Sequence, residues 1–277
     1  MSVPYLSVQD LSVSFPTRSD HFRAIDGISF DLARGEILAL VGESGSGKSM
    51  TSLSIMKLLP AAARMSGRIQ VDGQDIAALD RRQMEDVRGA KIGMIFQEPM
   101  TSLNPVLTIA RQMTEGMVRH NGLSRREALA TACTWLEDVG ISEPTRVLAQ
   151  YPHQLSGGMR QRIMIAAALA LRPGILIADE PTTALDVTVQ SQVLDLLVDL
   201  KARSGSGILL ITHDIGVVAE TADRVAVMRG GRILEVGTVD QVLRAPQHEY
   251  TQALLASHLT VEKGLKQRQA ELEGARP

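Results

Sequence analysis

Short runs in which apolar and polar residues alternate fill residues 5 to 35, and this spacing indicates antiparallel strands. The segment 67 to 76 adds a hairpin whose turn lies at Asp72 and Gly73. Between them, the apolar run 37 to 41 leads into a helix that we expect at residues 50 to 59, closed by Pro60. The pattern therefore predicts a β-rich N-terminal part that wraps around one strand–loop–helix unit.

Helical spacing replaces this pattern after a strand expected at residues 92 to 96. A first helix ends at Gly122, and Ser124 with Glu127 forms a capping box that opens a second helix. The positions that we expect to be buried on these two helices are Ile109, Met113, Met117, Leu129, Ala132, Cys133, Leu136 and Val139. We interpret this region, about residues 98 to 165, as a helical insertion.

Alternating strands and helices then return. The expected elements are a helix at 157–171, a strand at 175–178, a helix at 187–202, a strand at 208–212 and a hairpin at 225–236. The charged segment 261–277 is interpreted as a solvated helix or a frayed tail. Strands alternating with helices are typical of an α/β fold with a parallel sheet.

Composition narrows the function without identifying it. The 277 residues carry a formal charge of −2, which gives no global attraction to nucleic acid. The single cysteine, Cys133, excludes an internal disulfide and cannot form a metal or iron–sulfur site by itself. The N-terminus lacks the pattern of a signal peptide, and the longest apolar run, Ile163 to Leu171, is too short to cross a membrane. We therefore expect a cytoplasmic protein whose membrane role, if it has one, comes through a partner.

The most informative stretch is GESGSGKS, Gly42 to Ser49, which has the pattern of a phosphate-binding loop. Its glycines let backbone N–H groups point inward, and the following helix presents its positive end to a di- or triphosphate. Lys48 would reach the β and γ phosphates, and the Ser49 hydroxyl would coordinate Mg²⁺. The alternative is a Gly/Ser turn, but the position between an apolar strand and a helix favours nucleotide binding.

Polar residues follow three further apolar strands, at Gln97, Asp179 with Glu180, and His213. Open parallel sheets bind ligands at the carboxyl ends of their strands, so these side chains should meet the loop. Asp179 suits a Mg²⁺ site, and Glu180 suits the base that activates water for attack on the γ-phosphate. Gln97 would position water and Mg²⁺, or cap a strand. His213 would contact the γ-phosphate, or be a satisfied polar residue near the core.

A second anion-facing helix is indicated by LSGGMRQR, residues 155 to 162. Ser156 is a natural N-cap, and Gly157 and Gly158 permit close approach of a ligand to the backbone. This N-terminus lies at the far end of the insertion, away from the first loop. Two copies arranged head to tail would place each SGG over the nucleotide of the other copy. The alternative is an ordinary capped helix.

Together with TALD at 183 to 186, these motifs in this order resemble the ATPase subunit of ABC transporters, over about residues 5 to 256. The resemblance implies a RecA-like P-loop core, an antiparallel β subdomain and a helical subdomain, with residues 1–256 as ATPase domain and 257–277 as tail. It also implies two subunits that enclose two ATP molecules with Mg²⁺. The positions that it assigns to nucleotide binding are Phe15 (with Phe22 as a rival), Gly42, Ser44, Gly45, Gly47, Lys48, Ser49, Met50, Ser156, Gly157, Gly158 and Asp186. Lys48, Gln97, Glu180 and His213 are the expected catalytic residues, and Ser49, Gln97 and Asp179 the expected Mg²⁺ ligands.

Three segments, QEPMTSLNP (97–105), YPHQLSGGMRQRIMIA (151–166) and HEYTQALL (248–255), resemble importers of dipeptides and oligopeptides and their nickel-importing relatives. The resemblance implies two membrane permeases, a solute-binding protein and a second ATPase, homologous or identical. It places the chain on the cytoplasmic face of the inner membrane. With Cys133 alone we expect no iron–sulfur cluster. Peptide, nickel or another small solute remain open as cargo, and a soluble ABC-type NTPase acting on ribosomes or DNA is the rival function.

Overall fold

The computed structural model describes residues 4–17, 21–98, 102–183 and 185–257. Its central feature is a six-stranded sheet with the order β10-β9-β3-β8-β7-β6, in which only β10 is antiparallel to its neighbour. The strands are β3 (Ile37–Val41), β6 (Ile92–Ile95), β7 (Ile175–Asp179), β8 (Gly207–Ile211), β9 (Arg224–Arg229) and β10 (Arg232–Thr238). The predicted final hairpin is confirmed, and β9 also pairs with β3, so it belongs to the core sheet.

Continuous burial along β3, β7 and β8 reflects apolar layers on both faces of this sheet. Alternate residues of β8 serve different layers. Ile208 and Leu210 pack with the cluster that includes the helical insertion, whereas Leu209 and Ile211 pack with the cluster beneath the antiparallel sheet. The two faces of the sheet thus pack against two different hydrophobic clusters. This packing fixes the carboxyl ends of the strands relative to both clusters.

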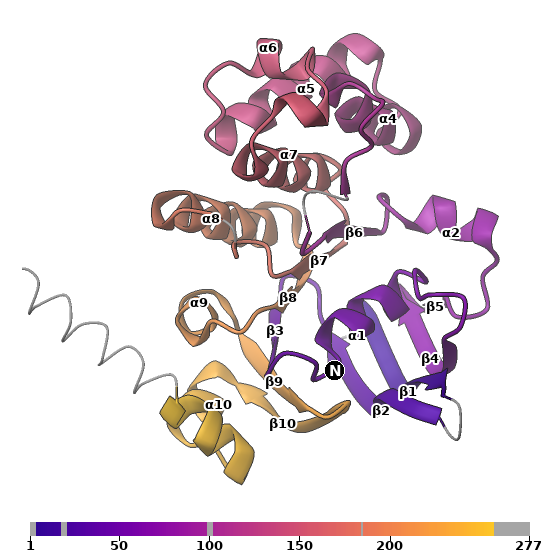
Figure 1. Ribbon diagram of the computed structural model, residues 1–277, viewed down its shortest axis with the longest axis vertical. Helices are drawn as coiled ribbons and strands as arrows, with labels where there is room; N and C mark the ends of the chain where they lie inside the picture. The colour runs from indigo at the N-terminus through magenta and orange to yellow at the C-terminus, as the bar shows by residue number, and fades with distance from the viewer. Residues whose placement is uncertain (1–3, 18–20, 99–101, 184, 258–277) are drawn as a thin grey trace, which may run out of the picture.

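The antiparallel sheet predicted for the N-terminal part is confirmed, with the order β2-β1-β4-β5. Its strands are β1 (Leu6–Pro16), β2 (His21–Leu32), β4 (Arg64–Val71) and β5 (Gln74–Asp75). The turn between β4 and β5 has positive φ at both Asp72 and Gly73, 52° and 75°, as a two-residue hairpin turn requires. Figure 1 shows this sheet beside α1, on the opposite side of the core from the helical insertion.

Between β6 and β7, every described element is helical, as predicted. The elements are α4 (Ile109–Asn121), α5 (Arg125–Asp138), α6 (Pro144–Leu148), a 3₁₀ turn (Pro152–Gln154) and α7 (Gly157–Ala170). The capping box of Ser124 and Glu127 is confirmed. The expected face of α5 is wrong at Leu129, which is 41% exposed, because the helix turns Ala128 inward instead. Cys133 is half-buried and packs against the helical core.

The other helices are α1 (Lys48–Ile55), α2 (Arg81–Val87), α8 (Val187–Ser204), α9 (Ile215–Thr221) and α10 (Val239–Arg244), and residues 249–257 are also helical. α1 begins and ends earlier than predicted, because Lys57 has a φ of 50° and the helix ends with Met56 as its C-cap. The sequence pattern did not predict α2. Across the described residues, no helix combines the length and apolarity needed to span a bilayer. The tail predicted at 261–277 lies outside the described residues.

Candidate active site

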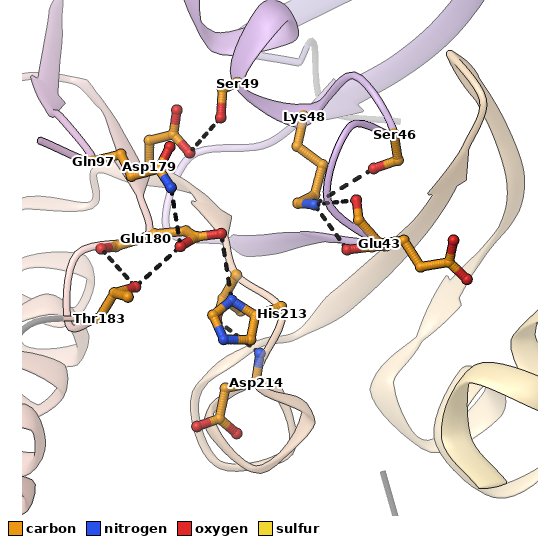
Figure 2. Close-up of polar contacts among 12 residues, drawn as sticks. Glu43, Ser46, Lys48, Ser49, Gln97, Asp179, Glu180, Thr183, His213 and Asp214 are labelled. Atoms are coloured by element: carbon orange, nitrogen blue, oxygen red, sulfur yellow. Dashed lines mark hydrogen bonds and ion pairs between the residues drawn. The ribbon is translucent and has the colours of Figure 1, made fainter. Parts of the chain in front are cut away.

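The polar residues predicted at four strand ends do meet at one edge of the core sheet. β3, β8, β7 and β6 are consecutive neighbours and run parallel, so their carboxyl ends lie side by side. The phosphate loop follows β3, and Gln97, Asp179 and His213 lie at the ends of the other three strands. Figure 2 shows the side chains of this edge converging from these separate segments.

The loop geometry explains why two of its positions are glycine. Gly42 and Gly47 have φ values of 155° and 109°. A Cβ atom would lie 2.0 Å from the Met228 carbonyl oxygen at Gly42, and 2.7 Å from the Ala24 carbonyl oxygen at Gly47. Gly47 also occupies the N-cap position of α1, where no side chain caps the helix. The N-cap residue therefore leaves the first N–H groups of α1 without a side-chain cap, as a phosphate site at a helix N-terminus requires.

Lys48 is folded back into the loop and is only 6% exposed. Its Nζ donates to the carbonyl oxygens of Gly42 at 2.8 Å and Glu43 at 2.9 Å, and to Ser46 Oγ at 3.4 Å. Burial lowers the pKa of Lys48, and the negative charges of Glu180, Asp179 and Glu43 partly oppose this shift. The ammonium is therefore oriented by the backbone at the place where the loop would receive a phosphate.

Asp179 and Ser49 form the part of the site that suits a divalent cation. Asp179 is 2% exposed and accepts hydrogen bonds from Ser49 Oγ at 3.2 Å and Ser52 Oγ at 3.0 Å. Burial raises the pKa of this carboxyl, and the two serine bonds and Lys48 oppose the shift. Among the described residues, no cluster of three His, Cys, Asp or Glu side chains could hold a metal alone. One carboxylate and one hydroxyl fit Mg²⁺, which keeps waters and takes its other oxygens from phosphates.

Glu180 is the centre of a second group of contacts. Its carboxylate accepts from Gln97 Nε2 at 3.3 Å and Thr183 Oγ1 at 3.1 Å, and lies 3.3 Å from His213 Nδ1. Its side chain is 15% exposed, whereas that of His213 is 58% exposed. Glu180 also has a φ of 47°, a conformation that costs an L residue about 1–3 kcal/mol and persists only where its surroundings hold it. A reactive role is a frequent reason for such strain.

The SGG turn starts α7 in the helical insertion, as predicted. Ser156 is the N-cap and accepts from the Met159 N–H at 3.3 Å. A Cβ atom added to Gly157 or Gly158 would meet no atom within 4 Å from the described residues outside its own helical turn. Within the described ranges, these three residues share no hydrogen bond with the phosphate loop or the strand ends. Asp186 caps α8 by accepting from Val189 N–H at 3.0 Å.

The remaining expected nucleotide contacts lie around the loop. Phe15 and Phe22 face each other across β1 and β2, and Phe22 is 60% exposed whereas Phe15 packs partly against the core. Both aromatic rings therefore lie at one end of the antiparallel sheet, and the choice between them stays a prediction. Ser44 and Gly45 are exposed, and Met50 packs partly against the core beneath the antiparallel sheet.

Sequence reasoning missed three residues that the structure adds to the site. Ser52 shares Asp179 with Ser49, and its place one helical turn after Ser49 could have signalled this. Thr183 contacts Glu180 across a tight turn, and TALD was noted only as a motif. Gln161, in α7, is 1% exposed and donates from Nε2 to the carbonyl oxygen of Pro181 at 2.6 Å. A glutamine in a charged stretch gives no sign of such burial.

Comparison with known proteins identifies the family. The family model described as ABC transporter matches residues 25–183. The chain is 57% identical over 256 residues to the peptidoglycan transport ATP-binding protein YejF of Agrobacterium fabrum, covering 92% of this chain and 47% of that protein. It is 50% identical over 274 residues to the oligopeptide transport ATP-binding protein OppD of Bacillus subtilis, covering 98% and 76%. The chain therefore spans about half of the first relative and three quarters of the second.

A solved structure agrees with these relatives. A dimeric ATP-binding cassette, determined in a post-hydrolysis state with ADP and Pi, matches with a TM-score of 0.77 and 28% identity. The match covers 84% of this chain and 98% of that one. The RecA-like core, the antiparallel sheet and the helical insertion are thus the expected cassette architecture. The chain belongs to the ABC transporter family, as an ATP-binding and ATP-hydrolysing subunit.

Proposed function

We propose that this chain is the motor subunit of an importer that takes up dipeptides and oligopeptides through separate membrane permease subunits. The observation that carries the proposal is the 50% identity to an oligopeptide transport ATP-binding protein along 98% of this chain. The complete set of polar residues at the strand ends supports it, because a motor must hydrolyse ATP as well as bind it. Nickel import was the sequence-based alternative, and no feature of the site favours it.

In the proposed reaction, Glu180 accepts a proton from the water that attacks the γ-phosphate. Gln97 and Thr183 orient its carboxylate through their hydrogen bonds, and His213 lies close enough to join the same network. Lys48 and the N–H groups at the start of α1 stabilise negative charge on the transferred phosphoryl group. Ser49, Asp179 and Gln97 would hold Mg²⁺, which would neutralise negative charge on the phosphates of the nucleotide.

The site is completed in this proposal by a second ATPase subunit, homologous or identical, in head-to-tail orientation. Ser156, Gly157 and Gly158 of one subunit face the γ-phosphate held by the other, and Asp186 links the two sites. The open surroundings of both glycines support this arrangement, because no described residue outside their own turn comes within 4 Å of the place where a Cβ atom would stand. ATP binding closes the pair, and hydrolysis lets it reopen.

The proposed complex further contains two integral permeases and an extracytoplasmic solute-binding protein, and the chain is peripheral on the cytoplasmic face of the membrane. The helical insertion would carry the opening and closing movement to the permeases. Cargo recognition then belongs to the permeases and the binding protein, and no nucleic acid takes part.

Mass spectrometry of the proteins that co-purify with this chain from gently solubilised native membranes tests the proposal. We expect two permeases, a second ATPase and a solute-binding protein that binds short peptides. A binding protein that binds nickel and not peptides would change the proposed cargo to nickel and leave the proposed ATPase role of this chain unchanged. Recovery of ribosomes or DNA-repair factors, without permeases, would overturn the transporter assignment.

A further inference from the structure

The backbone at Glu180 is strained, with a φ of 47°, and hydrogen bonds of its N–H and carbonyl groups hold it in this conformation. Its N–H donates to the Ile211 carbonyl oxygen in β8 at 2.9 Å, which fixes the start of the loop. The next residue, Pro181, has no N–H to donate. The Glu180 carbonyl oxygen accepts within the turn, from Thr183 N–H at 3.5 Å and Thr183 Oγ1 at 3.4 Å. The Pro181 carbonyl oxygen is the next backbone group after it through which the protein can fix the direction of the loop and of the Glu180 side chain.

The Pro181 carbonyl oxygen accepts a hydrogen bond from a residue of the helical insertion. Gln161 Nε2 donates to it at 2.6 Å, and the glutamine is 1% exposed. Gln161 lies in the second turn of α7, the helix that begins with the SGG residues. One short, buried hydrogen bond thus joins the SGG helix to the residue directly after Glu180.

The carbonyl oxygen of the Gln161 side-chain amide indicates that the residue is present for its hydrogen bond to Pro181. Its Oε1 is buried and has no hydrogen-bond partner among the described residues. A buried polar group that is only half satisfied is costly, and an apolar residue of the same size would avoid the cost. The donor to Pro181 is then the property that distinguishes glutamine from an apolar residue here.

The neighbouring residue binds the far end of the same loop. Arg162 donates from Nη2 to Asp186 Oδ2 at 3.2 Å and from Nη1 to the Gly140 carbonyl oxygen at 3.2 Å. Asp186 in turn caps α8. Adjacent residues of α7 therefore hold the segment 180–186 at both of its ends, and Gln161 makes the shorter and more buried contact.

We propose that Gln161 is a positioning residue that links the SGG helix to Glu180 within one subunit. Any displacement of α7 relative to the core sheet is passed through the Pro181 carbonyl to the backbone that aims the Glu180 carboxylate. A subunit whose SGG turn is engaged then sets its own general base as well as contacting the other subunit's nucleotide. This inference rests on the proposed role of Glu180.

The test compares Gln161→Met, Gln161→Asn and Glu180→Gln with the unaltered full chain, purified with the subunits that accompany it. Methionine keeps the length and volume of glutamine but removes the donor, and asparagine withdraws the amide by one methylene group. Gln83→Met, which removes a side-chain hydrogen bond at the start of α2, is the matched control. The measurements are kcat for ATP hydrolysis, the Kd for ATP, and the melting temperature.

We expect Gln161→Met and Gln161→Asn to lower kcat by about 10- to 100-fold, as small displacements of a reacting group do, with the Kd for ATP changed less than about twofold. Each should hold intact ATP, as Glu180→Gln should. Unchanged kcat in Gln161→Met, or parallel losses of ATP affinity and melting temperature, would overturn the inference. If Glu180→Gln itself hydrolyses ATP normally, the role of Glu180 fails instead, so the two failures are distinguishable.

Discussion

Two helices of this protein begin with glycine-rich turns suited to phosphate, and they differ in what surrounds them. At the start of α1, the backbone and side chains of the same subunit crowd Gly42 and Gly47, and Lys48 is already folded into the loop. At the start of α7, Gly157 and Gly158 face open space. Residues of the same chain surround the first turn, whereas the described part of the chain leaves the second turn open.

The difference separates two reasons for glycine. Within the phosphate loop, glycine is demanded by positive φ and by neighbouring carbonyl oxygens of this chain. In the SGG turn, neither glycine has a positive φ and the chain itself leaves room for a side chain. In the proposed pair of subunits, the nucleotide of the second subunit approaches these glycines from outside the chain.

The largest expected effect tests whether the site beside the phosphate loop, with Glu180 as its base, carries out ATP hydrolysis. Glu180→Gln should lower steady-state ATP hydrolysis by at least about 100-fold, because an amide cannot accept the proton from water. ATP binding should persist, since the cradle around Lys48 is unchanged. A phosphate-release assay paired with equilibrium ATP binding measures both. Turnover at the normal rate would remove Glu180 as the base.

The next effect tests the cradle itself. Lys48→Ala should weaken ATP binding by about 10- to 100-fold, the usual worth of hydrogen bonds from a charged group. Titration with a fluorescent ATP analogue measures the affinity, and tight binding by this variant would contradict the assigned cradle.

A matched pair of glycine variants tests the contrast directly. Gly47→Ala should lower the melting temperature of the nucleotide-free chain by several degrees, because the new Cβ meets the Ala24 carbonyl and φ is positive. Gly158→Ala should leave the melting temperature unchanged or slightly raised, since alanine favours helix, yet should reduce hydrolysis in the assembled pair. Calorimetry and ATPase assays give both values. An equal fall in melting temperature for the two variants would contradict the proposal that Gly47 is crowded by its own chain and Gly158 is not.

The smallest effect concerns the charge at the cation site. Burial raises the pKa of Asp179, so its protonated form favours folding at low pH and this contribution is lost as pH rises through the folded-state pKa. Asp179→Asn should therefore raise the melting temperature of the nucleotide-free chain by a few degrees at pH 7.5, and by less at a pH below 3.8, the ordinary pKa of the group. Melting curves at both pH values measure this. A variant that is less stable at pH 7.5 would show that the serine bonds outweigh burial.

The sequence predicted the parts of the site that stand directly after apolar runs. Gln97, Asp179 and His213 could be placed because parallel strands of one sheet end at one edge. Contacts between distant segments carried no such signal. Gln161 has the sequence context of a surface residue, and only the packing of α7 against the Pro181 loop buries it.

The fold was predicted with errors of similar origin. On α5, Leu129 lies beside the buried face, which runs through Ala128, Ala132 and Leu136, so the pattern placed the edge of that face one position too far along. The helix α2 has two buried residues, Met84 and Val87, which is too few to reveal a helical period. The pairing of β9 with β3 joins segments far apart in sequence, and the alternation of residues gives no information about which strands are neighbours.

The order of strands in the core sheet has a consequence for biosynthesis. The strand that leads into the phosphate loop, β3, lies between β8 and β9, which begin at Gly207 and Arg224. A nascent chain therefore carries the loop without either neighbour of β3 until residue 207 has been passed, and the carbonyl of Met228 that crowds Gly42 is made still later. The complete ATP cradle forms only after Met228 has been synthesised, so a chain interrupted before this residue does not present a formed ATP site.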